Sequence, residues 1–191
     1  MRVVGIDPGL VRTGWAVVEP SEVRTPPGGV AVVGIGLISP SANQNLARRL
    51  AEGANALRSV LATYQPTAAA LEEVFTAPRH PRSALLMAHM RGVICLVLEE
   101  AGIPILPLTA TTVKQRLTGS GHASKSQIQR MVLRLSGLVA TSGLRWDESD
   151  ALALAIAGVS QMARPAGGHG AGPASRRRIS PVLEAVLAHR R

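Results

Sequence analysis

The sequence of 191 residues is short of cysteine, and this shortage excludes two kinds of site. Cys95 is the only cysteine, so a single chain can form neither an internal disulfide nor a zinc site built from several thiolates. Such cysteine usage fits a reducing compartment, and we expect a cytoplasmic protein. The length suits one well-packed domain with additional ends rather than two full domains.

Long hydrophobic runs are also missing. The most apolar segment, residues 83–100, is interrupted by His89 and Arg91. The N-terminus lacks the basic region and the following apolar run of a secretory signal. The sequence therefore predicts no membrane-spanning segment.

The sequence has fewer acidic than basic residues. The chain has 21 lysine and arginine residues against 12 aspartate and glutamate residues, which gives a formal net charge of +9. This excess favours a polyanionic partner, either nucleic acid or an acidic membrane surface, with a generic basic surface as the alternative. Only three aspartates occur, Asp7, Asp147 and Asp150, and only two lysines, Lys114 and Lys125. Because arginine and glutamate supply all the other charged side chains, these five residues are candidates for specific roles.

Hydrophobic periodicity predicts one α/β domain over residues 1–162. Strands are expected at residues 2–6, 13–19, 30–38, 68–75 and 103–108. Helices are expected over about 46–64 and 83–101, then from about 110, after a capping box of Ser124 and Gln127, and from about 147. The resulting fold is a mixed five-stranded sheet flanked by helices, with the first strand central, the second antiparallel beside it and the fourth parallel on its other side. Residues 163–191 are rich in glycine, proline and arginine, and we expect a basic, flexible tail there.

Four acids are predicted to meet at one edge of this sheet. Asp7 ends the first strand and Glu72 lies near the end of the fourth, where sites in parallel sheets form. Asp147 and Asp150 are three residues apart, so both can lie on one face of a helical turn. Converging carboxylates repel one another unless protons or cations neutralise them, and oxygen ligands suit Mg²⁺ or Mn²⁺. Two such ions about 3.5–4 Å apart would promote in-line attack on a phosphodiester.

Each acid taken singly has a purely structural explanation. Asp7 ahead of Pro8 and Gly9 is equally typical of a tight turn. Asp147 and Asp150 are typical of helix caps that interact with the helix dipole. Only the joint placement of the acids favours a metal site.

Five segments together resemble the RuvC family of Holliday junction resolvases. In chain order they are GIDPG, LEEVF, VKQ, SKSQIQ and WDESDALALAIA. The resemblance covers about residues 1–162 and implies an RNase H-like fold, a homodimer, and paired symmetrical nicking of four-way DNA junctions. The implied cofactor is Mg²⁺, two ions per active site, for which Mn²⁺ can substitute. The implied partner is four-way junction DNA rather than a membrane, with a junction branch-migration helicase complex as a further candidate.

The resemblance also assigns the acids their roles. The acidic tetrad of the family falls on Asp7, Glu72, Asp147 and Asp150, and every one of these positions holds a carboxylate. The four residues are therefore implied to be catalytic and to bind the metal.

Basic and aromatic residues are carried over in the same way. The basic residues of the family near the scissile phosphate match Lys114 and Lys125, and its aromatic residue that stacks on a junction base matches Phe75. Without the resemblance, the lysines are typical of solvated helix residues, and Phe75 is as typical of a core residue at a strand end. Arg79 and Arg82 lie in the basic stretch TAPRHPR and are candidate contacts to the DNA backbone. This stretch and the arginine-rich tail depart from the family pattern, so the resemblance does not determine how these segments contact the junction.

Three other functions stay open at this point. Residues 119–126, GSGHASKS, come close to a nucleotide-binding phosphate loop, but Ser124 replaces the second glycine and a helical segment precedes them. A non-catalytic junction-binding scaffold is the second alternative, and a nuclease of the same fold acting on RNA–DNA hybrids is the third. Nicking assays with and without Mg²⁺ on different substrates separate these functions.

Overall fold

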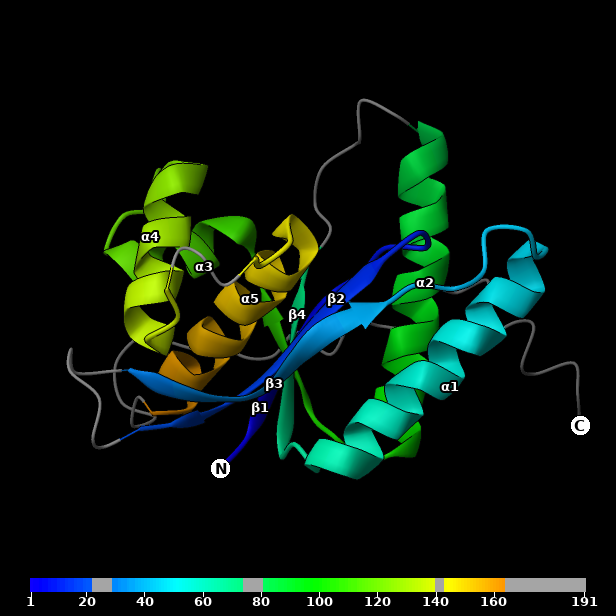
Figure 1. The fold of residues 1–191 in the computed structure, drawn as a ribbon, viewed down its shortest axis with the longest axis horizontal. Helices are drawn as coiled ribbons and strands as arrows, with labels where there is room; N and C mark the ends of the chain where they lie inside the picture. Colours follow the sequence, from blue (N-terminus) through cyan, green and yellow to red (C-terminus); the bar gives the residue numbers. More distant parts are fainter. Residues whose placement is uncertain (22–28, 74–80, 140–142, 164–191) are drawn as a thin grey trace, which may run out of the picture.

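Five strands form one mixed sheet in the order β3-β2-β1-β4-β5 (Figure 1). The computed structural model describes residues 1–21, 29–73, 81–139 and 143–163, with only the backbone at 81–83. The strands are β1 (Val3–Asp7), β2 (Thr13–Pro20), β3 (Val30–Ile38), β4 (Ala68–Glu72) and β5 (Ile105–Leu108). The central β1 pairs antiparallel with β2 and parallel with β4, which confirms the predicted RNase H-like sheet.

Helices cover both faces of the sheet. They are α1 (Leu46–Tyr64), α2 (Pro81–Glu100), α3 (Ala110–Thr118), α4 (Lys125–Ser136) and α5 (Trp146–Met162). Figure 1 shows α5 on one face with α3 and α4 beyond it, and α1 and α2 on the opposite face. Within the described residues, no helix is long and apolar enough to cross a membrane.

The element boundaries differ from the sequence prediction by small amounts. The capping box of Ser124 and Gln127 is present, and the last helix begins at Trp146, one residue earlier than predicted. The prediction of a fourth strand reaching residue 75 is wrong, because β4 ends at Glu72 and Glu73 is no longer in the strand.

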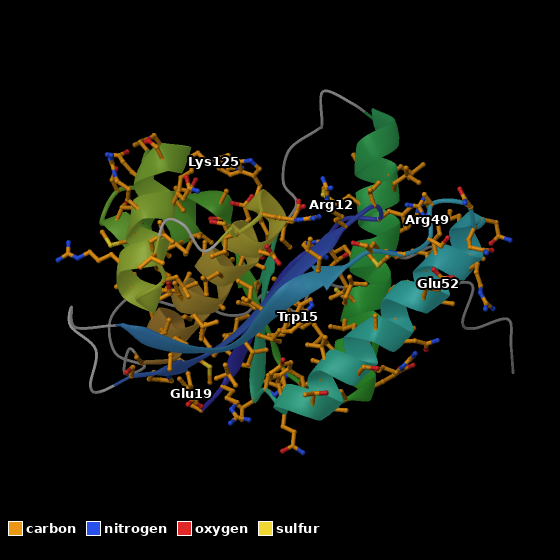
Figure 2. All side chains as sticks on the ribbon, in the orientation of Figure 1. Arg12, Trp15, Glu19, Arg49, Glu52 and Lys125 are labelled. Atoms are coloured by element: carbon orange, nitrogen blue, oxygen red, sulfur yellow. The ribbon has the colours of Figure 1, made fainter. Side chains whose placement is uncertain are left out.

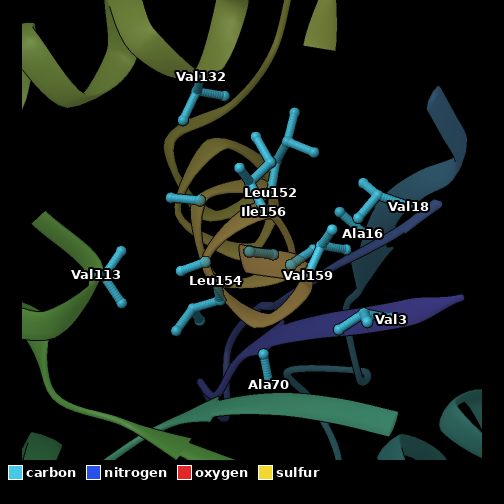
Figure 3. Close-up of a cluster of buried hydrophobic side chains, with 14 of the residues drawn as sticks. Val3, Ala16, Val18, Ala70, Val113, Val132, Leu152, Leu154, Ile156 and Val159 are labelled. Carbon is cyan, nitrogen blue, oxygen red and sulfur yellow. The ribbon is translucent and has the colours of Figure 1, made fainter. Parts of the chain in front are cut away.

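Side chains of the central strand alternate between two hydrophobic cores. Val3 packs into the core formed by α5, α3 and α4, whereas Val4 and Ile6 pack into the core formed by α1 and α2. Figure 3 shows the first core, in which Leu152 and Ile156 of α5 lie among strand and helix side chains. The sheet is thus buried on both faces at β1, which explains why this strand is apolar up to its last residue.

Helix α5 lies directly on the backbone of β1. A Cβ atom at Gly5 would overlap the Ala151 carbonyl oxygen and the Ala155 amide nitrogen. Small residues line the contact, and α5 is buried almost continuously from Ala151 to Val159. This close approach fixes the first turn of α5 beside the end of β1.

We predict that Gly5→Ala destabilises the fold by about 3 kcal/mol or more, because the added methyl group must displace helix backbone rather than a flexible side chain. Gly92→Ala is the matched control, since a Cβ atom at Gly92 in α2 meets no atom within 4 Å. That substitution should stabilise the protein slightly, as alanine favours a helix over glycine by about 1 kcal/mol. Urea unfolding of both variants measures the difference, and a Gly5→Ala variant as stable as wild type would contradict the close contact.

Candidate active site

Asp7 and Glu72 lie side by side at the carboxyl ends of parallel strands. The register pairs Ile6 with Leu71, so the next residue of each strand, Asp7 in β1 and Glu72 in β4, occupies the edge of the sheet. Both acids are half-buried. The turn after Asp7 is closed by Thr13, whose hydroxyl donates a hydrogen bond to the Gly9 carbonyl at 2.8 Å. The strand end and its tight turn are therefore arranged as the sequence predicted.

The N-terminal part of α5 brings two more carboxylates, Asp147 and Asp150, to this edge. Burial is the largest cause that raises the pKa of Asp7, and together with the charges of Asp150, Glu72 and Asp147 it brings this pKa to about 7. The pKa of Glu72 is raised chiefly by burial and then by the charge of Asp150. The structure thus places the four predicted acids close enough to act electrostatically on one another.

Three basic side chains surround the acids. Lys125 at the start of α4 lies 3.4 Å from the Asp150 carboxylate and lowers the pKa of Asp7, and Lys114 in α3 lowers that of Glu72. Arg12, in the turn between β1 and β2, donates a hydrogen bond from Nε to Oδ2 of Asp147 at 3.0 Å. Figure 2 labels Arg12 and Lys125, which approach α5 from opposite sides.

Arg12 and Trp146 were missed by the sequence interpretation. The ammonium of Lys125 lies 4.6 Å from the ring centre of Trp146, a cation–π contact beside Asp150. Trp146 is 58% exposed and directly precedes Asp147, so its position in the sequence was a usable signal. Arg12 offered a weaker signal, because its partner is 135 residues away in the chain.

A cavity of about 270 Å³ opens beside the acids. Its charged lining comes from Glu72, Asp150, Lys114 and Lys125, and its apolar lining from Ala110, Val113, Ile128, Ala153 and Leu154. The two predicted lysines and two of the predicted acids, Glu72 and Asp150, therefore share one concave site.

The donor chemistry of the four acids suits a hard divalent cation. All the candidate ligand atoms would be carboxylate oxygens, and after burial the charges of neighbouring acids contribute to the raised pKa of Asp7 and Glu72. In the part of the chain that the structure describes, no three His, Cys, Asp or Glu side chains are yet grouped closely enough to hold an ion. The chemistry of the four carboxylates nevertheless fits the donor set of a divalent-metal site.

The other predicted DNA contacts cannot be placed. Phe75 and Arg79 lie outside the described residues. Arg82 lies in α2, and its side chain is outside them as well.

The chain matches the family model of crossover junction endodeoxyribonuclease RuvC over residues 3–158. It belongs to the RuvC family. The RuvC of Paramagnetospirillum magneticum is 38% identical over 157 residues, which is 82% of this chain and 89% of the relative. The RuvC of Roseiflexus sp. is 40% identical over 158 residues, which is 81% of this chain and 88% of the relative.

Solved structures of the RuvC family have the same fold. Thermus thermophilus RuvC superimposes with a TM-score of 0.76 at 27% identity, covering 85% of this chain and 95% of the relative. The same protein in complex with Holliday junction substrate gives a TM-score of 0.77 at 28% identity, covering 85% of this chain and 94% of the relative. The resemblance inferred from the five sequence segments is confirmed, and the chain is a nuclease of this family.

We predict that Asp7→Asn stabilises the metal-free protein, and more so at high pH. The pKa of Asp7 is higher in the folded state than its ordinary 3.8, so its stabilising contribution is present below pH 4 and is lost as the pH rises through about 7. Asparagine avoids this loss, which amounts to at most about 4 kcal/mol at pH 8.

Urea unfolding in a chelator at pH 5 and pH 8 measures the effect. Glu99→Gln, which removes one negative charge from an exposed position on α2, is the control. If the free energy of unfolding differs between the Asp7→Asn variant and wild type by the same amount at both pH values, the assigned burial of Asp7 is contradicted.

Proposed function

We propose that this chain resolves four-way DNA junctions by paired symmetrical nicks, through metal-dependent hydrolysis of the phosphodiester backbone. The observation that carries the proposal is the meeting of Asp7 and Glu72 at the sheet edge with Asp147 and Asp150 from α5. Membership of the RuvC family supports the reaction class, and the similar Thermus thermophilus structure in complex with Holliday junction substrate supports the substrate.

The four acids would hold the metal, which we propose to be two Mg²⁺ ions per site, with Mn²⁺ as a substitute. The bound ions would supply a water-derived nucleophile at neutral pH and Lewis-acid stabilisation of the phosphate. The chain itself contributes the fixed geometry. Asp7 and Glu72 are held by the rigid central strands, and Asp147 and Asp150 by a helix packed against β1.

Lys114 and Lys125 are proposed to act on the scissile phosphate. Both line the cavity beside Glu72 and Asp150, where a phosphodiester could contact acids and ammonium groups together. An ammonium group is compact and contacts phosphate as a point charge, whereas a guanidinium group would bind two phosphate oxygens that the metal also needs. Stabilisation of charge that develops during attack would lower the barrier more than it strengthens binding.

The remaining DNA contacts are proposed from the sequence. Phe75 would stack on a junction base, which is typically worth about 1–3 kcal/mol, and Arg79 and Arg82 would contact the backbone. The basic tail at 163–191 would lie outside a catalytic domain of residues 1–162.

We also propose a homodimer, because symmetrical nicking requires two active sites. Leu85 and Leu96 in α2 are 61% and 56% exposed, and their spacing of eleven residues places them on the same face of the helix. A second copy of the chain packed along this face of α2 would cover both side chains. A junction branch-migration helicase complex is a further proposed partner, and a cytoplasmic location is proposed as well.

We predict that Asp7→Asn abolishes cleavage and leaves junction binding intact, because the change removes a ligand charge while it preserves size. The assay compares a synthetic four-way junction, a linear duplex and an RNA–DNA hybrid, each with Mg²⁺ and with a chelator. Glu73→Gln is the control, since Glu73 follows Glu72 but lies beyond the end of β4.

Cleavage of the four-way junction alone, dependent on Mg²⁺ and lost in the Asp7→Asn variant, is the expected result. Preferential cleavage of the hybrid would favour the RNA–DNA alternative. Binding without cleavage by the wild type would favour the scaffold.

We predict that Lys114→Ala and Lys125→Ala lower the single-turnover cleavage rate of bound junction by about tenfold or more, with a smaller loss of affinity. Lys→Arg at either position should restore binding but only part of the rate. Single-turnover measurements on saturated complex separate the two effects. Fully active Lys→Arg variants would show that the lysines only anchor phosphate.

A further inference from the structure

Asp147 and Asp150, near the start of α5, each have a cationic partner from another element. Arg12 contacts Asp147 at 3.0 Å, and Lys125 contacts Asp150 at 3.4 Å. Among the ion pairs of the described residues, none involves Asp7 or Glu72. Among the described residues, Asp7 and Glu72 thus have no ion-pair partner, whereas Asp147 and Asp150 each pair with a basic side chain.

The Arg12 side chain is poised to move without disturbing the fold. It is 51% exposed, and the described part of the chain gives it no hydrogen-bond partner other than Asp147. The backbone around it is fixed, because Thr13 and Gly9 exchange two hydrogen bonds across the turn. Gly14 packs against the Asp147 carbonyl so closely that a Cβ atom there would overlap it. The guanidinium group can therefore swing into solvent while the turn and the helix stay in place.

We propose that Arg12 occupies Asp147 in the metal-free protein as a substitute for the metal ion, and that a divalent cation must displace it to bind. The inference rests on the proposed function, since it takes Asp147 as a metal ligand. Arg12 is thereby a positioning residue that acts through Asp147. It pairs with the carboxylate in the absence of metal and competes with the ion for the same oxygen atoms.

Two physical effects give this competition its direction. The ion pair between Arg12 and Asp147 is lost when the metal takes over the carboxylate, and an arginine charge beside the site repels the incoming cation. Removing the guanidinium group should therefore strengthen metal binding. The opposite role, in which Arg12 orients Asp147 for the metal, predicts weaker binding on the same substitution, so the sign of the effect separates the two.

The test measures the dissociation constant of Mn²⁺ by calorimetry on the full chain without DNA, so that it does not depend on cleavage. Arg12→Gln should lower this constant by about twofold to fivefold at low ionic strength. Arg58→Gln is the matched control. Arg58 is 49% exposed and pairs with Glu100 at 2.9 Å between α1 and α2, so its substitution breaks a similar ion pair and changes the net charge equally.

Two further variants test the route through Asp147. Arg12→Lys keeps the charge and should retain a dissociation constant close to wild type. In an Asp147→Asn background, Arg12→Gln should change the dissociation constant of Mn²⁺ much less than it does in the wild type. The carboxylate for which Arg12 and the ion compete is then absent. The gain in Mn²⁺ affinity caused by Arg12→Gln should be smaller at high salt, because salt screens the repulsion between the guanidinium group and the ion.

Unchanged or weaker Mn²⁺ binding by Arg12→Gln would overturn the inference, and so would an equal gain in Arg58→Gln. In those cases wild-type metal binding and junction cleavage would remain, and the proposed function would stand. A wild-type chain that binds no Mn²⁺ would overturn the proposed metal site together with this inference.

Discussion

The contact between α5 and the backbone of β1 is the constraint on which the site depends. Gly5 has no side chain, so the helix settles against the strand with the Ala151 carbonyl and the Ala155 amide in direct contact with it. Gly14 allows the same approach one strand away, against the Asp147 carbonyl. Because the helix cannot move outward without opening the core, Asp147 and Asp150 near its start stay beside the end of the central strand.

This packing brings together negative charges that repel one another. Burial and the neighbouring acids raise the pKa of Asp7 to about 7, so the metal-free site holds its charge at a cost in stability. Arg12 offsets part of this repulsion by pairing with Asp147, and Lys125 does so by pairing with Asp150. Lys114 in α3 acts in the same direction on Glu72, because its charge lowers the pKa of that carboxyl. A cluster of carboxylates that is costly without a counter-charge would suit the binding of divalent cations in a nuclease of this family.

Much of this arrangement could be predicted from the sequence because it follows local patterns. The apolar strand ending in Asp7, the turn at Pro8 and Gly9, and the capping box at Ser124 are all encoded within a few residues. The position of Trp146 directly before Asp147 was a local signal, but the partners that Trp146 and Arg12 contact depend on which elements become neighbours in the folded chain. The end of β4 at Glu72 was also missed, since LEEVF continues a pattern typical of a strand beyond the residue where pairing stops.

The central claim is that Asp7, Glu72, Asp147 and Asp150 form one metal site. The most direct test is an anomalous difference map from crystals of the wild-type chain soaked in Mn²⁺. The account predicts anomalous density among the four carboxylates, with Asp7 as a ligand and the Arg12 guanidinium group displaced from Asp147. Well-ordered crystals with no density among these acids, or with Mn²⁺ bound only elsewhere on the surface, would contradict it.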